Sequence, residues 1–148
     1  MPQATFSRKR SAELYMIGGR SAILRMFRTD GTEVNTTSGT DGIPPNGMCV
    51  VRFFNTQGEQ IGIQRLLVHN ISATNGPFYI SLDRQPTGTL SLLSNYDFAV
   101  DTGTRFIMMD ADIREVYIYN NFSSTRTIYT AGHNNYGVHI AGFTFPNP

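Results

Sequence analysis

Few residues in the chain have types and spacings that suit catalysis or metal binding. The one cysteine, Cys49, stands in the apolar run of residues 48–51. A reactive thiol needs partial exposure and a nearby cation or histidine. An apolar strand offers neither, so we predict a buried structural thiol. The histidines are His69, His133 and His139. Zinc sites use closely repeated ligands, and because these spacings do not repeat, we predict no metal site.

Asp110 and Asp112 are the carboxylates best spaced to act together. Residues two apart in a strand share a face, and paired carboxylates suit cation binding or acid–base catalysis. Arg114 continues that face, which instead favours an ion-pair ladder at a sheet edge. No glycine-rich calcium loop surrounds the pair. We therefore predict a ladder, no catalytic residues and no cofactor, with a hydrolase as the weakest alternative.

Tyrosines recur along the predicted strands, at Tyr79, Tyr117, Tyr119, Tyr129 and Tyr136. Such rings can stack on sugars or bases. Tyrosine is also common in strands and in protein interfaces. No basic residues are interleaved with these rings, so we interpret them as strand and interface residues.

Charged residues are scarce in this chain. They make up 16% of its 148 residues, against about 25% in typical soluble domains. Lys9 is the only lysine, and the other 11 of the 12 basic residues are arginines. Lysine is depleted and arginine enriched at protein interfaces. The composition favours a surface that is largely covered by partners, in an oligomer or a larger assembly.

The first 29 residues are basic, whereas the remainder is mildly acidic. Up to Thr29 there are six basic residues and one acid, a net +5, and from Asp30 onward six basic and ten acidic residues give −4. We predict a basic N-terminal arm at residues 1–29 and a single domain at residues 30–148. The residues expected to contact acidic protein surface or nucleic acid are Arg8, Lys9, Arg10, Arg20, Arg25 and Arg28.

Short strands bounded by turn residues recur along most of the chain. Their spacing of about 8–12 residues is typical of β-sandwiches and barrels. Residues 48–55 and 60–71 predict a hairpin with Gly58 in the turn, residues 21–28 alternate as a strand, and residues 36–47 predict a long loop. We therefore predict an all-β fold, either an antiparallel β-sandwich or a jelly-roll-like barrel, with an extended basic N-terminal arm.

Alternation within the predicted strands identifies the expected core. In a half-buried strand, every second side chain points inward. The side chains expected to face the inside of the sandwich are Phe78, Ile80, Leu82, Phe106, Val116 and Ile118. A domain of this length can bury enough surface to fold without a metal or a disulfide.

The middle of the chain contains a series of predicted extended segments, which are separated by short turns and one variable loop. These segments are residues 67–71, 78–83, 98–102, 105–107 and 114–120. This cadence, within residues 66–131, resembles small β-sandwich structural proteins of tailed bacteriophage virions. Those proteins decorate capsids or build necks, tails and fibres. The resemblance implies no catalysis, no cofactor and symmetric assembly with other virion proteins.

Together these features predict a non-enzymatic virion structural protein, most specifically a capsid decoration or cement protein that bridges neighbouring subunits. A neck, tail or fibre component is one alternative, and a carbohydrate- or receptor-binding β-sandwich module is another. The expected partners are other virion proteins and further copies of the chain, with nucleic acid as a second candidate partner of the arm.

No membrane partner is expected, since no run of eighteen apolar residues occurs. The first residues do not read as a secretory signal. We therefore expect synthesis in the host cytoplasm and a final location in the virion.

Overall fold

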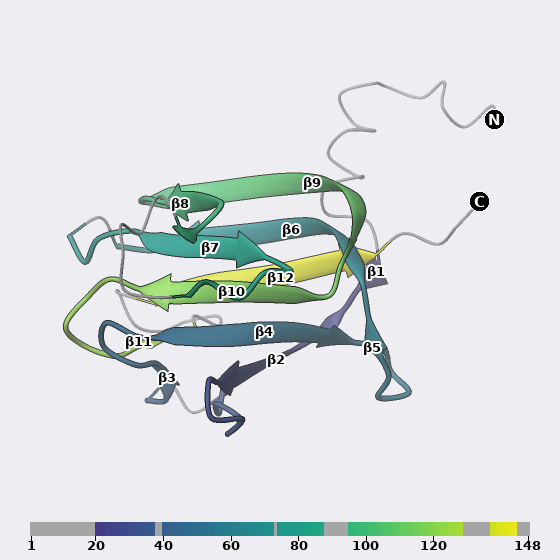
Figure 1. The fold of residues 1–148 in the computed structure, drawn as a ribbon, viewed down its shortest axis with the longest axis horizontal. Helices are drawn as coiled ribbons and strands as arrows, with labels where there is room; N and C mark the ends of the chain where they lie inside the picture. The colour runs from purple at the N-terminus through teal and green to yellow at the C-terminus, as the bar shows by residue number, and fades with distance from the viewer. Residues whose placement is uncertain (1–19, 38–39, 73, 88–94, 129–136, 145–148) are drawn as a thin grey trace.

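The computed structural model describes residues 20–37, 40–72, 74–87, 95–128 and 137–144 (Figure 1). The predicted contact residues Arg8, Lys9 and Arg10 lie outside these ranges, as does His133. The described residues form twelve strands and almost no helix. Neighbouring strands within each sheet are antiparallel. The predicted all-β fold is confirmed as an antiparallel β-sandwich.

Two sheets form the layers of the sandwich. The four-stranded sheet has the order β1 (Arg20–Ser21), β12 (Val138–Thr144), β6 (Ile63–Asn70) and β9 (Gly103–Ile113). The six-stranded sheet has the order β2 (Ile23–Arg28), β4 (Met48–Phe54), β10 (Glu115–Asn120), β7 (Phe78–Leu82) and β8 (Phe98–Val100), with β5 (Gln60–Ile61) paired to β4. A small third sheet pairs β3 (Gly42–Ile43) with β11 (Arg126–Thr127).

The chain crosses between the two large sheets at sharp bends. β1 leads into β2 at Ala22, β5 into β6 at Gly62, and β9 into β10 at Arg114. Figure 1 shows these bends gathered at the right-hand end of the molecule. A side chain at Gly62 would place its Cβ 2.6 Å from Cβ of Asp112. This close approach explains why glycine occupies the bend.

The predicted hairpin of residues 48–55 and 60–71 is confirmed, and Gly58 adopts the positive φ of its turn at +83°. Its second half is divided at Gly62 into β5 and β6, which belong to different sheets. The predicted long loop at residues 36–47 contains the short strand β3. The two-residue strand was not evident in the sequence because its pairing with β11 is non-local.

The core fills the space between the two sheets. The fully buried apolar side chains of the long strands are Met26, Cys49, Val51, Phe53, Ile63, Leu66, Val68, Phe78, Ile80, Val116, Ile118 and Val138. The predictions for Phe78, Ile80, Val116 and Ile118 are therefore confirmed. Leu82 is partly buried and packs against the core.

The prediction that Phe106 faces the core is wrong. Phe106 lies opposite Leu67 of β6, whose neighbours Leu66 and Val68 are the ones that point inward. Directly opposite residues of an antiparallel pair share a face, so Phe106 lies on the outer face and is 44% exposed. Residues 106–109 are all apolar, and such a run carries no alternation from which the inward face could be predicted.

The predicted boundary between arm and body after Thr29 also needs correction. β1 pairs with β12 and β2 pairs with β4, so residues 20–28 are strands of the sandwich. Met26 of β2 is fully buried in the core. The charge count misplaced the boundary because Arg25 stands between Leu24 and Met26, which point inward, and Arg28 stands at the end of the same strand.

A buried arginine closes the end of the sandwich away from the bends. Arg126 is the largest fully buried side chain in the described ranges. Its Nη2 donates to Oδ1 of Asn70 at 2.6 Å, and its Nη1 donates to the carbonyls of Gly76 at 2.8 Å and Asn75 at 3.2 Å. Its guanidinium carbon lies 3.8 Å from the centroid of the Phe78 ring. Burial lowers the pKa of Arg126 to about 10, so the group stays charged at neutral pH.

Two buried asparagines make further polar contacts, Asn70 within this network and Asn120 with a separate set of backbone groups. Nδ2 of Asn70 donates to the carbonyls of Gly76 at 3.0 Å and Val100 at 3.1 Å. Nδ2 of Asn120 lies within hydrogen-bonding distance of three carbonyls, those of Ile43, Pro44 and Ser124. Through these bonds the side chains satisfy backbone groups of loops that could not otherwise be buried.

Replacing Arg126 with methionine should destabilise the fold by at least about 3 kcal/mol, because several buried acceptors would lose their donor. Urea denaturation measures the change. Arg114→Met is the matched control, since Arg114 is exposed and its guanidinium donates to the Gln60 carbonyl at the surface. The control should lose less than about 0.5 kcal/mol. Equal losses in the two variants would contradict a structural role for the buried charge.

Candidate functional site

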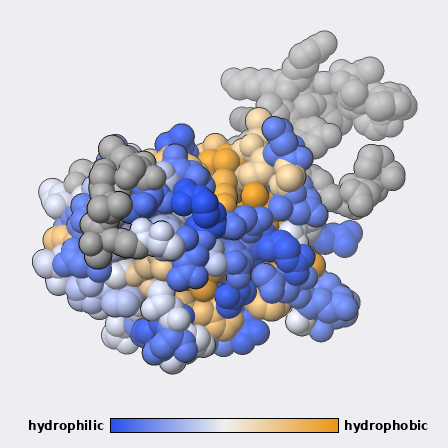
Figure 2. Space-filling view, in the orientation of Figure 1, coloured by the Kyte–Doolittle hydropathy of each residue, from blue (hydrophilic) through white to orange (hydrophobic). Residues whose placement is uncertain are grey.

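Exposed apolar side chains gather on the outer face of the four-stranded sheet. Phe106 is 44% exposed and Met108 63% exposed, at alternate positions of β9. Leu67 of β6 lies opposite Phe106, and Ala141 of β12 lies opposite Leu67. We call Leu67, Phe106, Met108 and Ala141 the β9 patch. In Figure 2, apolar side chains lie in the region that β9 occupies in Figure 1, and further apolar side chains lie across the lower part of the view.

β9 is an edge strand of its sheet. β6 pairs with one side of β9, and no described strand pairs with the other side. An edge of this kind presents unpaired N–H and C=O groups to any chain that can align with it. The pairing with β6 is regular from Gly103 to Met108, and a bulge interrupts it before Ile113. Phe106 and Met108 of the β9 patch therefore lie on the regular part of an edge that no described strand covers.

The outer face of the six-stranded sheet is covered by its own side chains. The guanidinium of Arg25 lies 5.3 Å from the ring of Phe27 and 5.1 Å from the ring of Phe54. The guanidinium of Arg52 also lies over the ring of Phe27, at 5.2 Å from its centroid. Arg52 forms an ion pair with Glu115 at 2.8 Å. Through these contacts, arginine side chains of the same chain cover the aromatic rings of this face. The β9 patch has no such cover among the described residues.

Two of the predicted contact arginines bind carboxylates of the same chain. Arg25 contacts Glu33 through two hydrogen bonds of 2.6 and 3.0 Å, and these bonds hold the pKa of Glu33 below its ordinary value. Arg28 pairs with Asp41. The charges of Arg25 and Arg28 are thus balanced within the body of the protein.

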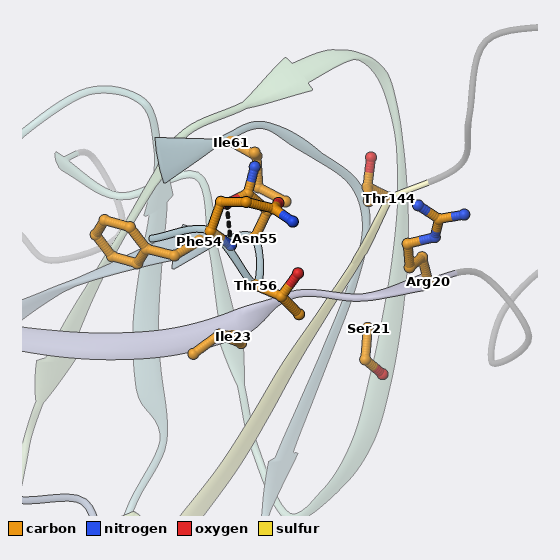
Figure 3. Close-up of a pocket in the computed structure, with 9 residues that line it drawn as sticks. Arg20, Ser21, Ile23, Phe54, Asn55, Thr56, Ile61 and Thr144 are labelled. Atoms are coloured by element: carbon orange, nitrogen blue, oxygen red, sulfur yellow. Dashed lines mark hydrogen bonds between the residues drawn. The ribbon is translucent and has the colours of Figure 1, made fainter. Parts of the chain in front are cut away.

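The third described contact arginine, Arg20, lies beside a surface cavity of about 390 Å³ (Figure 3). Ile23, Phe54 and Ile61 give the cavity an apolar side, and Thr144 lies near Arg20. The lining residues in the described ranges include one charged group and no carboxylate, histidine or cysteine. They therefore lack the paired groups that acid–base or nucleophilic catalysis requires.

The predicted ladder of Asp110, Asp112 and Arg114 is wrong. Asp112 accepts a hydrogen bond from Nε2 of Gln64. Arg114 donates through Nη2 to the carbonyl of Gln60 at 3.2 Å, and the described ion pairs do not join it to either aspartate. The reason is that Arg114 stands at the bend into β10, so the alternation of β9 does not extend to it.

The prediction for Cys49 is confirmed. Its side chain is fully buried in the core. Burial raises the pKa of the Cys49 thiol to about 12, so the thiol stays protonated at neutral pH. A protonated thiol is a poor nucleophile and a poor metal ligand.

The tyrosines pack on one another. The ring centroids of Tyr79, Tyr96 and Tyr119 lie 6.0 to 6.4 Å apart, with interplanar angles of 49° to 57°. Such tilted packing is favourable between rings, but it does not make a flat platform for a sugar or a base. The hydroxyl of Tyr117 donates to Oε1 of Glu115 at 2.6 Å. Tyr129 and Tyr136 lie outside the described residues.

Sequence reasoning missed a pair of histidines. His139 of β12 lies directly opposite His69 of β6 on the outer face, and Nδ1 of His69 lies 2.7 Å from Oγ1 of Thr104 on β9. Burial, and to a lesser extent the charge of His69, lower the pKa of His139. The described ranges hold no group of three or more histidine, cysteine or acidic side chains placed to bind a metal. Sheet register alone brings these distant residues together.

Comparison of the chain with protein-family models, curated proteins and solved structures found no match. No helix within the described ranges is long and apolar enough to cross a membrane. The function of the chain is therefore inferred from its own residues.

Acidification should destabilise the fold through His139. Its pKa in the folded protein lies below the ordinary value of 6.5, so the unfolded chain takes up the proton first as the pH falls. The free energy of unfolding should decrease as the pH drops below 6.5 towards the folded-state pKa. Urea denaturation at about pH 7.5 and about pH 5.5 should show a smaller decrease for His139→Gln than for the wild type. The same decrease in both proteins would contradict this role.

Proposed function

We propose that the chain is a non-enzymatic structural protein of a virion that acts by binding neighbouring protein subunits. The most specific role that we propose is a capsid decoration or cement protein. The β9 patch carries this proposal. Phe106 and Met108 are exposed on an open sheet edge, and monomeric proteins usually protect such edges with charges, prolines or covering segments. An exposed apolar edge is typical of a surface that another chain covers.

The composition of the chain supports the same proposal. Charged residues amount to only 16%, and Lys9 is the single lysine. A protein that stays free in solution generally carries more charge on its surface. Scarce charge combined with an apolar edge favours a subunit whose surface is buried in an assembly.

The groups considered for catalysis favour a structural protein over a hydrolase. Cys49 is buried and protonated at neutral pH. Asp112 is hydrogen-bonded to Gln64, and Arg114 is bonded to backbone at the bend. The tilted packing of the tyrosines likewise does not favour the carbohydrate- or receptor-binding alternative.

A cement protein stabilises a particle by simple thermodynamics. Each copy binds the assembled subunits and not the separated ones, so its binding free energy adds to the cost of separation. A neck, tail or fibre component would use the same kind of contact. The proposed partners are other virion proteins, and the proposed location is the virion.

Replacing both Phe106 and Met108 with serine should weaken binding to the particle at least about tenfold, because burial of these side chains supplies apolar contact free energy. Co-sedimentation of the purified protein with its particle measures the binding. Ile23→Ser is the matched control, since Ile23 is 47% exposed and lies on β2 in the other sheet. Binding that is unchanged in the double variant, or no binding by the wild type, would contradict the proposal.

A further inference from the structure

The regular half of β9 can accept another strand. Residues 103–108 contain no proline and no lysine, the residues that most often block an edge. Arg105 does not block it, because its guanidinium lies 4.6 Å from the ring of Phe98 and donates to the carbonyl of Ala99 at 3.2 Å. Its charge is directed towards β8, in the other sheet. The backbone groups of β9 on the side away from β6 have no partner strand in the described structure.

We propose that β9 pairs antiparallel with β9 of a second copy of the chain, across a twofold axis at Ile107. The pairing joins two four-stranded sheets into one continuous sheet. A twofold interface uses the same surface of both copies, so it requires a strand that is complementary to itself. This inference rests on the proposed structural function and names the partner of the β9 patch.

The sequence of β9 is complementary to itself in this register. With the axis at Ile107, Phe106 of each copy lies opposite Met108 of the other copy. Directly opposite residues share a face, so both Phe–Met pairs lie on the outer face and cover the two most exposed apolar side chains of this sheet. Leu67, opposite Phe106 in the same chain, extends the apolar contact.

The neighbouring registers are less favourable. In a twofold antiparallel pair, the residue at the axis lies opposite the same residue of the other copy. The alternative registers closest to this one are therefore centred on Met108 and on Phe106. With the axis at Met108, each Phe106 would lie opposite the carboxylate of Asp110. With the axis at Phe106, each Met108 would lie opposite the hydroxyl of Thr104. Only the register centred on Ile107 pairs both large apolar residues with each other.

The charges of β9 favour the antiparallel direction. Arg105 lies in the first half of the strand, and Asp110 and Asp112 lie in the second half. In the antiparallel register centred on Ile107, Arg105 lies opposite Met109 and Asp110 lies opposite Thr104, so like charges do not face each other. In-register parallel pairing would instead place Arg105 opposite Arg105 and Asp110 opposite Asp110, and like charges directly opposite each other destabilise a strand pair.

The oligomeric state of the full chain tests the pairing. Sedimentation equilibrium should find a dimer for the wild type, and Met108→Lys should weaken dimerisation at least about tenfold. Ile23→Lys is the matched control, because it changes another exposed apolar residue, 47% exposed against 63% for Met108, on an edge strand of the other sheet, and it should leave the dimer unchanged. A wild-type monomer, or equal loss in both variants, would overturn the proposal.

Disulfide formation tests the register. The native Cys49 is buried, so thiols introduced into β9 are the reactive ones. Opposite residues lie about 4.5–5.5 Å apart between Cα atoms, within the range that a disulfide spans. A mixture of Phe106→Cys and Met108→Cys proteins should therefore form a mixed disulfide dimer under mild oxidation, and neither variant alone should do so as efficiently. Efficient cross-linking of one variant with itself would overturn the register centred on Ile107.

The two proposals can fail separately. A wild-type monomer that nevertheless binds its particle would overturn the β9 pairing and leave the structural function standing. A dimer that binds no particle would support the pairing and contradict the virion function.

Discussion

The buried guanidinium of Arg126 holds together the end of the sandwich at which the loops meet. It reaches the end of β6 through Asn70, the following turn through Gly76, and β7 through the ring of Phe78. These contacts join one large sheet to the other at the end opposite the bends. Arginine suits this position because its planar guanidinium can donate several hydrogen bonds and stack on a ring at the same time. The cost of burying the charge is offset by bonds to groups that are themselves buried.

With both ends fixed, the outer faces of the two sheets are left with different surfaces. On the outer face of the six-stranded sheet, Arg25 and Arg52 stack on aromatic side chains of the same sheet. Arg25 pairs with Glu33, and Arg52 pairs with Glu115. The four-stranded sheet ends at β9, whose Phe106 and Met108 have no comparable cover within the part of the chain that the structure describes. This contrast, together with the absence of a described partner strand on one side of β9, is the basis of the proposed strand pairing. In the proposed function, the exposed apolar edge at β9 is the feature that links the fold to binding of another chain.

Prediction from sequence succeeded where alternation was clear and failed where it was not. Phe78 and Ile80 alternate with polar neighbours, and both are buried as predicted. The apolar run that begins at Phe106 carries no such signal, and there the inward face was predicted wrongly. Arg114 was assigned to the face of Asp112 because a straight strand was assumed, whereas the chain bends into the other sheet at that residue.

The sequence by itself determined the all-β class, the hairpin at Gly58, the buried thiol of Cys49 and most of the predicted core, because these depend on local periodicity and turn chemistry. Only the tertiary structure decided that residues 20–28 are strands of the body, that His69 faces His139, and that Arg126 is buried. It also decided that Phe106 lies on an open edge. Each of these depends on which distant strands pair and in which register, and register is set by the packing of whole faces rather than by neighbours along the chain.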